Sequence, residues 1–82
     1  MVSISYSPVF EKRVRKLKDA ALKEKVKKQL IKIINNPEIG KPMKYSRAGT
    51  RELYVSPFRL SYSYLKKEEK IVILDLYHKD GQ

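Results

Sequence analysis

Arg59 is the residue whose position in this chain points most directly to chemistry. It stands between Phe58 and Leu60 in a run where apolar and polar residues alternate, so its side chain is expected on the opposite sheet face to its neighbours. A guanidinium fixed on a strand can bind a phosphate or a carboxylate through two parallel hydrogen bonds. A cross-strand pair with Glu52 or Asp75 is the purely structural alternative.

The same alternation predicts two distinct sheet faces. The polar face is predicted to consist of Glu52, Tyr54, Arg59, Ser61, Ser63, Asp75 and Tyr77, with Lys79 in the same phase. The apolar face is predicted to pack on helices through Leu53, Val55, Phe58, Leu60, Tyr62, Tyr64, Val72, Leu74 and Leu76. Small serines among charged and aromatic side chains indicate a shallow groove on the polar face.

Helix and strand signals place these faces in one α+β domain over residues 1–82. A short strand near the N-terminus is followed by a helix that begins at Ser7-Pro8. Asp19 is predicted to cap a second helix, which Asn35-Asn36-Pro37 ends, so the two helices form a hairpin. An antiparallel three-strand meander then completes one sheet with both helices on one face, with strands expected over residues 51–56, 58–65 and 71–77.

Charge is the strongest feature of the composition. Lys and Arg number 19 against 9 Asp and Glu, which gives a formal net charge of +10, and ten of the cations lie between Lys12 and Lys32. Such an excess predicts an anionic partner: nucleic acid, the ribosome or an acidic protein. The chain has no cysteine and no apolar run long enough for a membrane span, so we expect a cytoplasmic protein without a membrane partner.

Four motifs, taken in order, resemble the RelE/ParE toxin superfamily over almost the whole chain. They are Gly40-Lys41-Pro42-Met43-Lys44, Gly49-Thr50-Arg51-Glu52-Leu53-Tyr54-Val55, Phe58-Arg59-Leu60-Ser61-Tyr62 and Leu76-Tyr77-His78-Lys79. The resemblance implies a toxin that a cognate antitoxin keeps inactive. Members of the RelE branch are ribosome-dependent nucleases that cut messenger RNA, whereas the ParE branch poisons DNA gyrase.

The resemblance also implies catalytic roles for individual residues. Arg59 matches the arginine that contacts the scissile phosphate, His78 matches a histidine that acts in acid–base catalysis, and Lys79 lies near a basic residue after the last strand. Arg51 lies close to basic residues that precede the hairpin. The glutamate that some relatives carry before the Pro-Leu-Lys segment is missing here, where Lys41 and Pro42 stand, so Glu52 on the polar face is the only candidate for a carboxylate base. This chain departs from its relatives at Tyr54, where many carry arginine, and in having no tyrosine after the last strand.

The implied chemistry is attack of the RNA 2′-hydroxyl on the adjacent phosphate, which needs cations and proton transfer but no metal or other cofactor. Single-stranded RNA binding would fall to cations and stackable rings: Lys41, Lys44, Tyr45, Arg47, Tyr54 and Tyr77. The expected partners are messenger RNA, the ribosome and an acidic antitoxin, with the chain a monomer alone or part of a hetero-oligomer. Gyrase inhibition and a decayed toxin that only binds its antitoxin are the alternatives.

Overall fold

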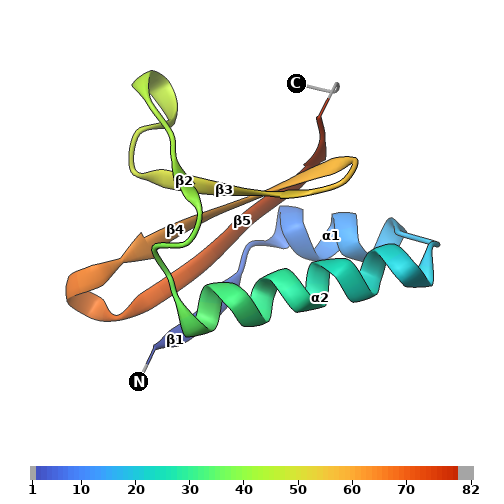
Figure 1. Ribbon diagram of the computed structural model, residues 1–82, viewed down its shortest axis with the longest axis horizontal. Helices are drawn as coiled ribbons and strands as arrows, with labels where there is room; N and C mark the ends of the chain where they lie inside the picture. The colour runs from blue at the N-terminus through green and yellow to red at the C-terminus, as the bar shows by residue number, and fades with distance from the viewer. Residues whose placement is uncertain (1, 80–82) are drawn as a thin grey trace.

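The computed structural model describes residues 2–79 and folds them into two helices and a five-stranded sheet. In chain order the elements are β1 (Ser3–Tyr6), α1 (Pro8–Lys16), α2 (Ala20–Asn35), β2 (Lys41–Pro42), the 3-10 helix η1 (Tyr45–Arg47), β3 (Thr50–Val55), β4 (Phe58–Leu65), the 3-10 helix η2 (Lys66–Glu68) and β5 (Lys70–His78). Figure 1 shows both helices beneath the sheet. The predicted α+β class is confirmed.

Side-chain caps set the helix boundaries, as the sequence predicts. The Ser7 hydroxyl accepts a hydrogen bond from the Phe10 amide at 3.1 Å, and Pro8 occupies the first turn of α1. The Asp19 carboxylate accepts hydrogen bonds from the Ala21 and Leu22 amides at the start of α2. Within residues 2–79, neither helix combines the length and the apolar character needed to cross a bilayer.

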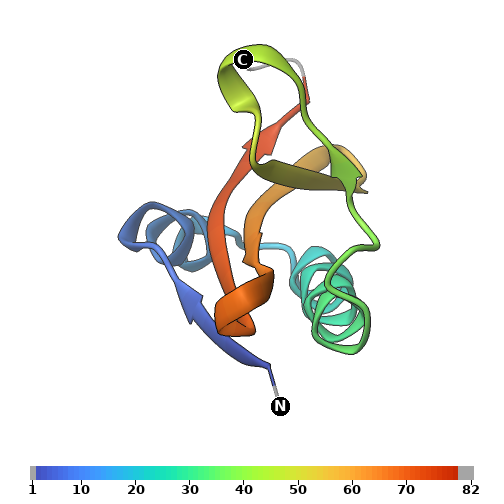
Figure 2. The ribbon, with the colours of Figure 1, turned by 90° about the vertical axis from the view of Figure 1, so that its left-hand side faces the viewer.

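The strand order is β1-β5-β4-β3-β2, with β1 parallel to β5 and every other pair antiparallel. The N-terminal strand therefore lies at one edge and pairs only with the first half of β5, from Lys70 to Ile73. The second half of β5 has α1 beside it instead, as Figure 2 shows. Ser7 makes this transition, because its amide donates to the Ile73 carbonyl and its hydroxyl to the Leu74 carbonyl.

The core forms between the helices and the facing side of the sheet. Its buried members are Phe10, Val26, Ile33, Val55, Leu60, Tyr62, Ile71, Ile73 and Leu76. The predicted inward positions on β3 and β4 are confirmed at Val55, Leu60 and Tyr62.

The prediction for the first half of β5 is wrong. Ile71 and Ile73 are fully buried, whereas Val72 and Leu74, which were expected in the core, are only partly buried. A register shift explains the difference: Tyr62 pairs with Ile73 but Ser61 pairs with Asp75, so Leu74 is an extra residue in β5. This β-bulge changes the phase of the strand, so that Ile73 and Leu76 both face the helices.

Tyr62 is the polar anchor of the core. Its ring is completely buried, and its hydroxyl donates to the Pro37 carbonyl and accepts from the Gly40 amide, both at 2.8 Å. A Cβ atom at Gly40 would lie 2.6 Å from that hydroxyl, so only glycine fits there. Burial raises the pKa of Tyr62, which keeps the phenol protonated. Together these contacts fix the segment that connects α2 to β2.

Replacing Tyr62 by phenylalanine should lower the free energy of unfolding by about 1–3 kcal/mol, because a buried amide and a buried carbonyl then lose their partner. Urea denaturation measures the change. Tyr64→Phe, in the same strand, is the matched control, since the Tyr64 hydroxyl has no hydrogen bond within the described residues. Equal stabilities of the two variants would show that the Tyr62 hydroxyl contributes nothing.

Candidate functional site

The predicted polar residues of the last three strands share one sheet face. Strand pairing aligns Arg59 with Tyr54 on one side and Tyr77 on the other. In the next row of the same face, Ser61 is aligned with Glu52 and Asp75. The bulge at Leu74 makes this alignment possible. Because of the extra residue, Asp75 and Tyr77 face the polar side of the sheet, although Ile71 and Ile73 face the helices.

Glu52 is the buried centre of this face, with a side chain only 4% exposed. Its Oε2 accepts hydrogen bonds from the Tyr77 hydroxyl at 2.5 Å and from Arg47 Nη1 at 3.2 Å. Its Oε1 is buried without a hydrogen-bond donor among the described residues, and Arg59 Nη1 lies 3.9 Å from it. Glu52 therefore acts as the common counter-ion of two arginines.

Tyr77 and Arg47 enclose this carboxylate. Arg47 Nη1 donates to the Tyr77 hydroxyl at 2.9 Å, and its guanidinium lies 5.5 Å from the centre of the Tyr77 ring. Burial raises the pKa of Tyr77, and the hydrogen bond to Glu52 raises it further against the effect of Arg47. The phenol therefore stays protonated and donates to Glu52.

Arg59 is the one charged residue of β4. Its side chain is 36% exposed, whereas its Nε is buried and has no hydrogen-bond acceptor within residues 2–79. The guanidinium lies 5.9 Å from the centre of the Tyr54 ring, and the ammonium group of Lys79 lies 6.0 Å from the same centre. Two cations thus border one half-exposed aromatic ring, which is an arrangement suited to a phosphate beside a stacked base.

Two predicted catalytic residues lie away from Arg59. His78 is aligned with Phe58 and contacts its ring edge-on at 5.5 Å between centres, so it belongs to the opposite face of β5. Arg51 is aligned with the buried Tyr62 and donates to the Glu38 and Gly40 carbonyls at 3.0 and 2.8 Å. Arg51 therefore holds the connection between α2 and β2, and the structure brings neither residue to the polar face.

The predicted RNA-binding loop lies at the far edge of the sheet, where Figure 1 shows η1 standing away from the helices. Lys41 is exposed and aligned with Glu52, which places it at the border of the polar face. Lys44 is also exposed, and Tyr45 is 92% exposed. Of this loop, Arg47 reaches the polar face most directly, through Glu52 and Tyr77.

Arg13 is a residue of this site that the sequence analysis missed. It extends from α1 to Asp75, with Arg13 Nε 3.0 Å from Asp75 Oδ1. The pair forms because α1 lies beside the half of β5 that β1 does not pair with. This placement depends on where the sheet edge ends and not on any local motif. The only signal in the sequence is that Arg13 lies next to Val14, which forms with Phe10 and Leu17 the apolar side of α1.

Two cavities meet at Arg13. The first, which we call the polar cavity, has a volume of about 400 Å³ and is lined by Arg13, Ser46, Arg47, Thr50, Glu52, Ser61, Asp75 and Tyr77. The second, which we call the α1 groove, has a volume of about 500 Å³ and is lined by Val9, Lys12, Arg13, Lys16, Leu17, Phe58 and Leu76.

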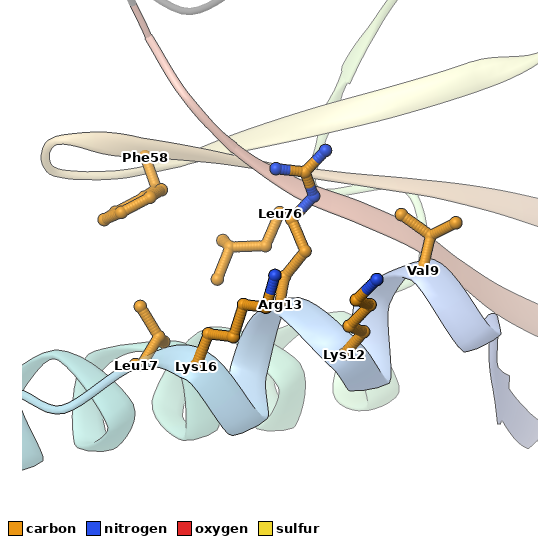
Figure 3. Close-up of a pocket in the computed structure, with 7 residues that line it drawn as sticks. All are labelled: Val9, Lys12, Arg13, Lys16, Leu17, Phe58 and Leu76. Atoms are coloured by element: carbon orange, nitrogen blue, oxygen red, sulfur yellow. The ribbon is translucent and has the colours of Figure 1, made fainter.

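The α1 groove combines an apolar floor with cations. Figure 3 shows Leu17, Phe58 and Leu76 pointing into the space between α1 and the sheet, with Lys12 and Lys16 along the helix. Val9 at one end of the groove is 49% exposed. Within residues 2–79, no cluster of three or more His, Cys, Asp or Glu side chains is arranged to hold a metal ion.

Comparison with known proteins identifies the family. Residues 4–82 match the family model described as the ParE toxin of the type II toxin–antitoxin system parDE. A search of the curated proteins found no significant match. Matches among solved structures are numerous at low sequence identity, and they agree on the fold.

Three solved structures illustrate this agreement. The YoeB/ParE toxin from Agrobacterium tumefaciens has a TM-score of 0.83 at 14% identity, covering 94% of this chain and 98% of the other. The RelBE2 toxin–antitoxin complex from Mycobacterium tuberculosis gives 0.81 at 23%, covering 95% and 98%. The intact RelBE toxin–antitoxin complex of E. coli gives 0.79 at 18%, covering 98% and 99%. With the match to the family model, the fold and the arrangement of its faces establish that this chain belongs to the ParE toxin family, within the RelE/ParE superfamily of type II toxin–antitoxin systems.

Proposed function

We propose that this toxin is a messenger-RNA endonuclease that cleaves its substrate on the ribosome by activating the 2′-hydroxyl of the RNA, as members of the RelE branch do. The observation that carries the proposal is the state of Arg59. Its side chain is 36% exposed on the polar face, its terminal nitrogens make no hydrogen bond within residues 2–79, and its nearest carboxylate oxygen is 3.9 Å away, whereas its Nε is buried. An arginine in this state is available to a phosphate.

The neighbours of Arg59 support the same reading. Lys79 lies at the same Tyr54 ring, so two cations would share the negative charge that develops on the phosphate during attack. Tyr54 is half-exposed and provides a surface on which a base can stack. Exposed Lys41 and Lys44 would follow the RNA backbone beyond this point.

Neither candidate for proton transfer, Glu52 or His78, lies as favourably for its role as Arg59 does for phosphate binding. Glu52 Oε2 accepts from Tyr77 and Arg47, and the buried Oε1 faces Arg59 at 3.9 Å. The role of Glu52 in this proposal is therefore to hold the cations and not to accept a proton from the substrate. His78 lies on the other face of β5 and stays a predicted acid. Most of the rate enhancement would therefore come from positioning the phosphate and stabilising its charge.

The test adds purified toxin to a translating extract and maps the ends of the messages. A ribosome-dependent nuclease gives cuts at one fixed position within codons, and these cuts disappear when the same RNA is supplied without ribosomes. Intact messages at a toxin concentration equal to that of the ribosomes would exclude this function.

Gyrase inhibition is the second candidate, and two observations favour it. The matching family model is that of ParE, and His78 does not face Arg59. A supercoiling assay with purified gyrase separates the two candidates, because an inhibitor of gyrase blocks supercoiling at toxin concentrations that leave messages intact. A chain that fails in both assays and does not arrest growth when expressed alone would be a decayed toxin.

An acidic antitoxin is the protein partner that the surface favours. The solved complexes of E. coli and M. tuberculosis contain an antitoxin bound to a toxin of this fold. In this chain the α1 groove offers an apolar floor bordered by Lys12, Arg13 and Lys16. An amphipathic segment with leucine-like side chains on one face and carboxylates beside them would match both features.

Reversing two charges of the groove, as Lys12→Glu with Lys16→Glu, is expected to weaken antitoxin binding by about tenfold or more, since carboxylates would then face like charges. The matched control is Lys28→Glu with Lys32→Glu on α2, which makes the same change in net charge. Titration calorimetry at low and high salt measures both variants. Equal affinities of the two variants would place the antitoxin elsewhere.

A further inference from the structure

The polar cavity contains groups of both signs, and this distinguishes it from the phosphate-binding surface at Arg59. Arg13 and Arg47 provide donors, whereas Glu52 and Asp75 provide carboxylates. Two carboxylates within one cavity disfavour a second phosphate. A neutral ligand edge with both donors and acceptors suits the lining better, and the volume of about 400 Å³ is within the range for small-ligand sites.

The position of the cavity relates it to the proposed scissile phosphate. Ser61 lies two residues after Arg59 on β4, on the same face and at the floor of the cavity. Two residues of a strand span about 7 Å, which is comparable with the length of one nucleotide in an extended single strand. A nucleotide whose phosphate lay at Arg59 could therefore place its base, or that of its neighbour, in the cavity.

Asp75 and Arg13 form the recognition edge of the cavity. Asp75 Oδ1 is occupied, because it accepts from Arg13 Nε at 3.0 Å and from the Leu76 amide at 2.7 Å. The other oxygen, Oδ2, has no hydrogen-bond partner among the described residues, and the same holds for the terminal nitrogens of Arg13. The pair thus offers unused acceptor positions next to unused donors.

We propose that the polar cavity binds a guanine base of the RNA, with Asp75 Oδ2 accepting from the N1 and N2 groups through its two unused acceptor positions and the terminal nitrogens of Arg13 donating to O6 and N7; the inference rests on the nuclease function proposed above. Guanine is the base that offers two neighbouring donors to a carboxylate and two neighbouring acceptors to a guanidinium. The Tyr77 ring and the Arg47 guanidinium provide flat surfaces beside it. Asp75 and Arg13 are then specificity-determining residues.

The test measures binding by fluorescence anisotropy with 2′-O-methylated RNA hexamers, which cannot be cleaved. Each hexamer carries a single G, A or C in a uridine background. The parent toxin is expected to bind the G hexamer about 5- to 100-fold more tightly than the others. Asp75→Asn should remove this preference while the affinity for the other hexamers stays equal or rises.

The direction of the effect separates recognition from bulk charge. Asp75→Asn makes the chain more positive, so general electrostatics would strengthen binding of every hexamer. A selective loss for the G hexamer cannot have that origin. Glu24→Gln on α2 makes the same change in charge away from the cavity and should keep the preference.

A second variant tests the same site if the Asp75→Asn chain does not fold. Arg13→Ala should also abolish the preference for G, whereas Arg15→Ala, on the same helix and with the same loss of charge, should keep it. A parent toxin that binds the three hexamers equally, or variants of Asp75 and Arg13 that retain the preference, would overturn the inference. The nuclease proposal would survive that result if codon-phased cleavage is observed, so the two failures are distinguishable.

Discussion

Replacing Arg59 by alanine is expected to lower the rate of message cleavage by about 10²–10³-fold, because the variant lacks the charge-assisted donors that stabilise the phosphate in the transition state. The same change should cost less than about 1 kcal/mol of stability. The closest ionic partner of Arg59, Glu52 Oε1, is 3.9 Å from Nη1, so no short ion pair is broken. Cleavage rates in the translating extract and urea denaturation measure the two effects.

Two further variants define what Arg59 supplies. Arg59→Lys keeps the charge but lacks the planar fork, so we expect its rate to lie between those of the parent and of Arg59→Ala. Arg15→Ala removes a cation from exposed α1 surface and is the control for net charge. If Arg59→Ala and Arg15→Ala cleave equally fast, Arg59 has no part in the reaction.

Glu52→Gln is expected to lower the free energy of unfolding by about 2–3 kcal/mol. The carboxylate is almost fully buried and accepts hydrogen bonds from Tyr77 and Arg47. In the variant a neutral amide replaces it, so the two donors lose their charged acceptor. The expected loss is at or below the lower end of the range of about 3–5 kcal/mol for breaking a buried ion pair, because the Arg47 and Arg59 side chains are 43% and 36% exposed and water can solvate them. Urea denaturation at neutral pH is the measurement.

The exposed Glu68 of η2 provides the control, since Glu68→Gln makes the same chemical change and should alter stability by less than about 0.5 kcal/mol. Combining Glu52→Gln with Arg59→Ala tests how much of the lost stability comes from the Arg59 contact and how much from the Tyr77 and Arg47 contacts. The cost of Glu52→Gln should be nearly unchanged in the Arg59→Ala background, because Tyr77 and Arg47 make the short contacts. A Glu52→Gln chain as stable as the parent would show that the buried carboxylate is dispensable.

Most of the fold could be predicted because its signals are local. Ser7 with Pro8 and Asp19 are capping residues in the sequence and in the structure. The alternation around Arg59 fixed the polar face of β3 and β4, since each strand is regular there. In β5 the run from Ile71 to Leu74 is apolar throughout, so alternation carries no phase information and the bulge could not be located.

The candidate site was predictable only where it follows strand phase. Arg51 and His78 illustrate an available signal, because alternation already places Arg51 with Leu53 and His78 with Leu76, away from Arg59. Arg13 illustrates the opposite case. Its approach to Asp75 depends on β1 ending its pairing at Ile73 so that α1 can lie beside β5, which no short segment of the sequence encodes.

The bulge at Leu74 divides β5 into halves with different freedom to evolve. The half from Lys70 to Ile73 is paired on both edges, and its Ile71 and Ile73 side chains are packed in the core, so few residues are acceptable at these two positions. The half that carries Asp75 and Tyr77 has a partner strand on one edge only and presents these side chains to an open cavity. If the cavity selects the base as proposed, exchange of Asp75 changes which RNA the toxin prefers at little cost to folding, whereas Tyr77 is held in place by the buried Glu52. Substrate choice can then diversify while the scaffold stays the same.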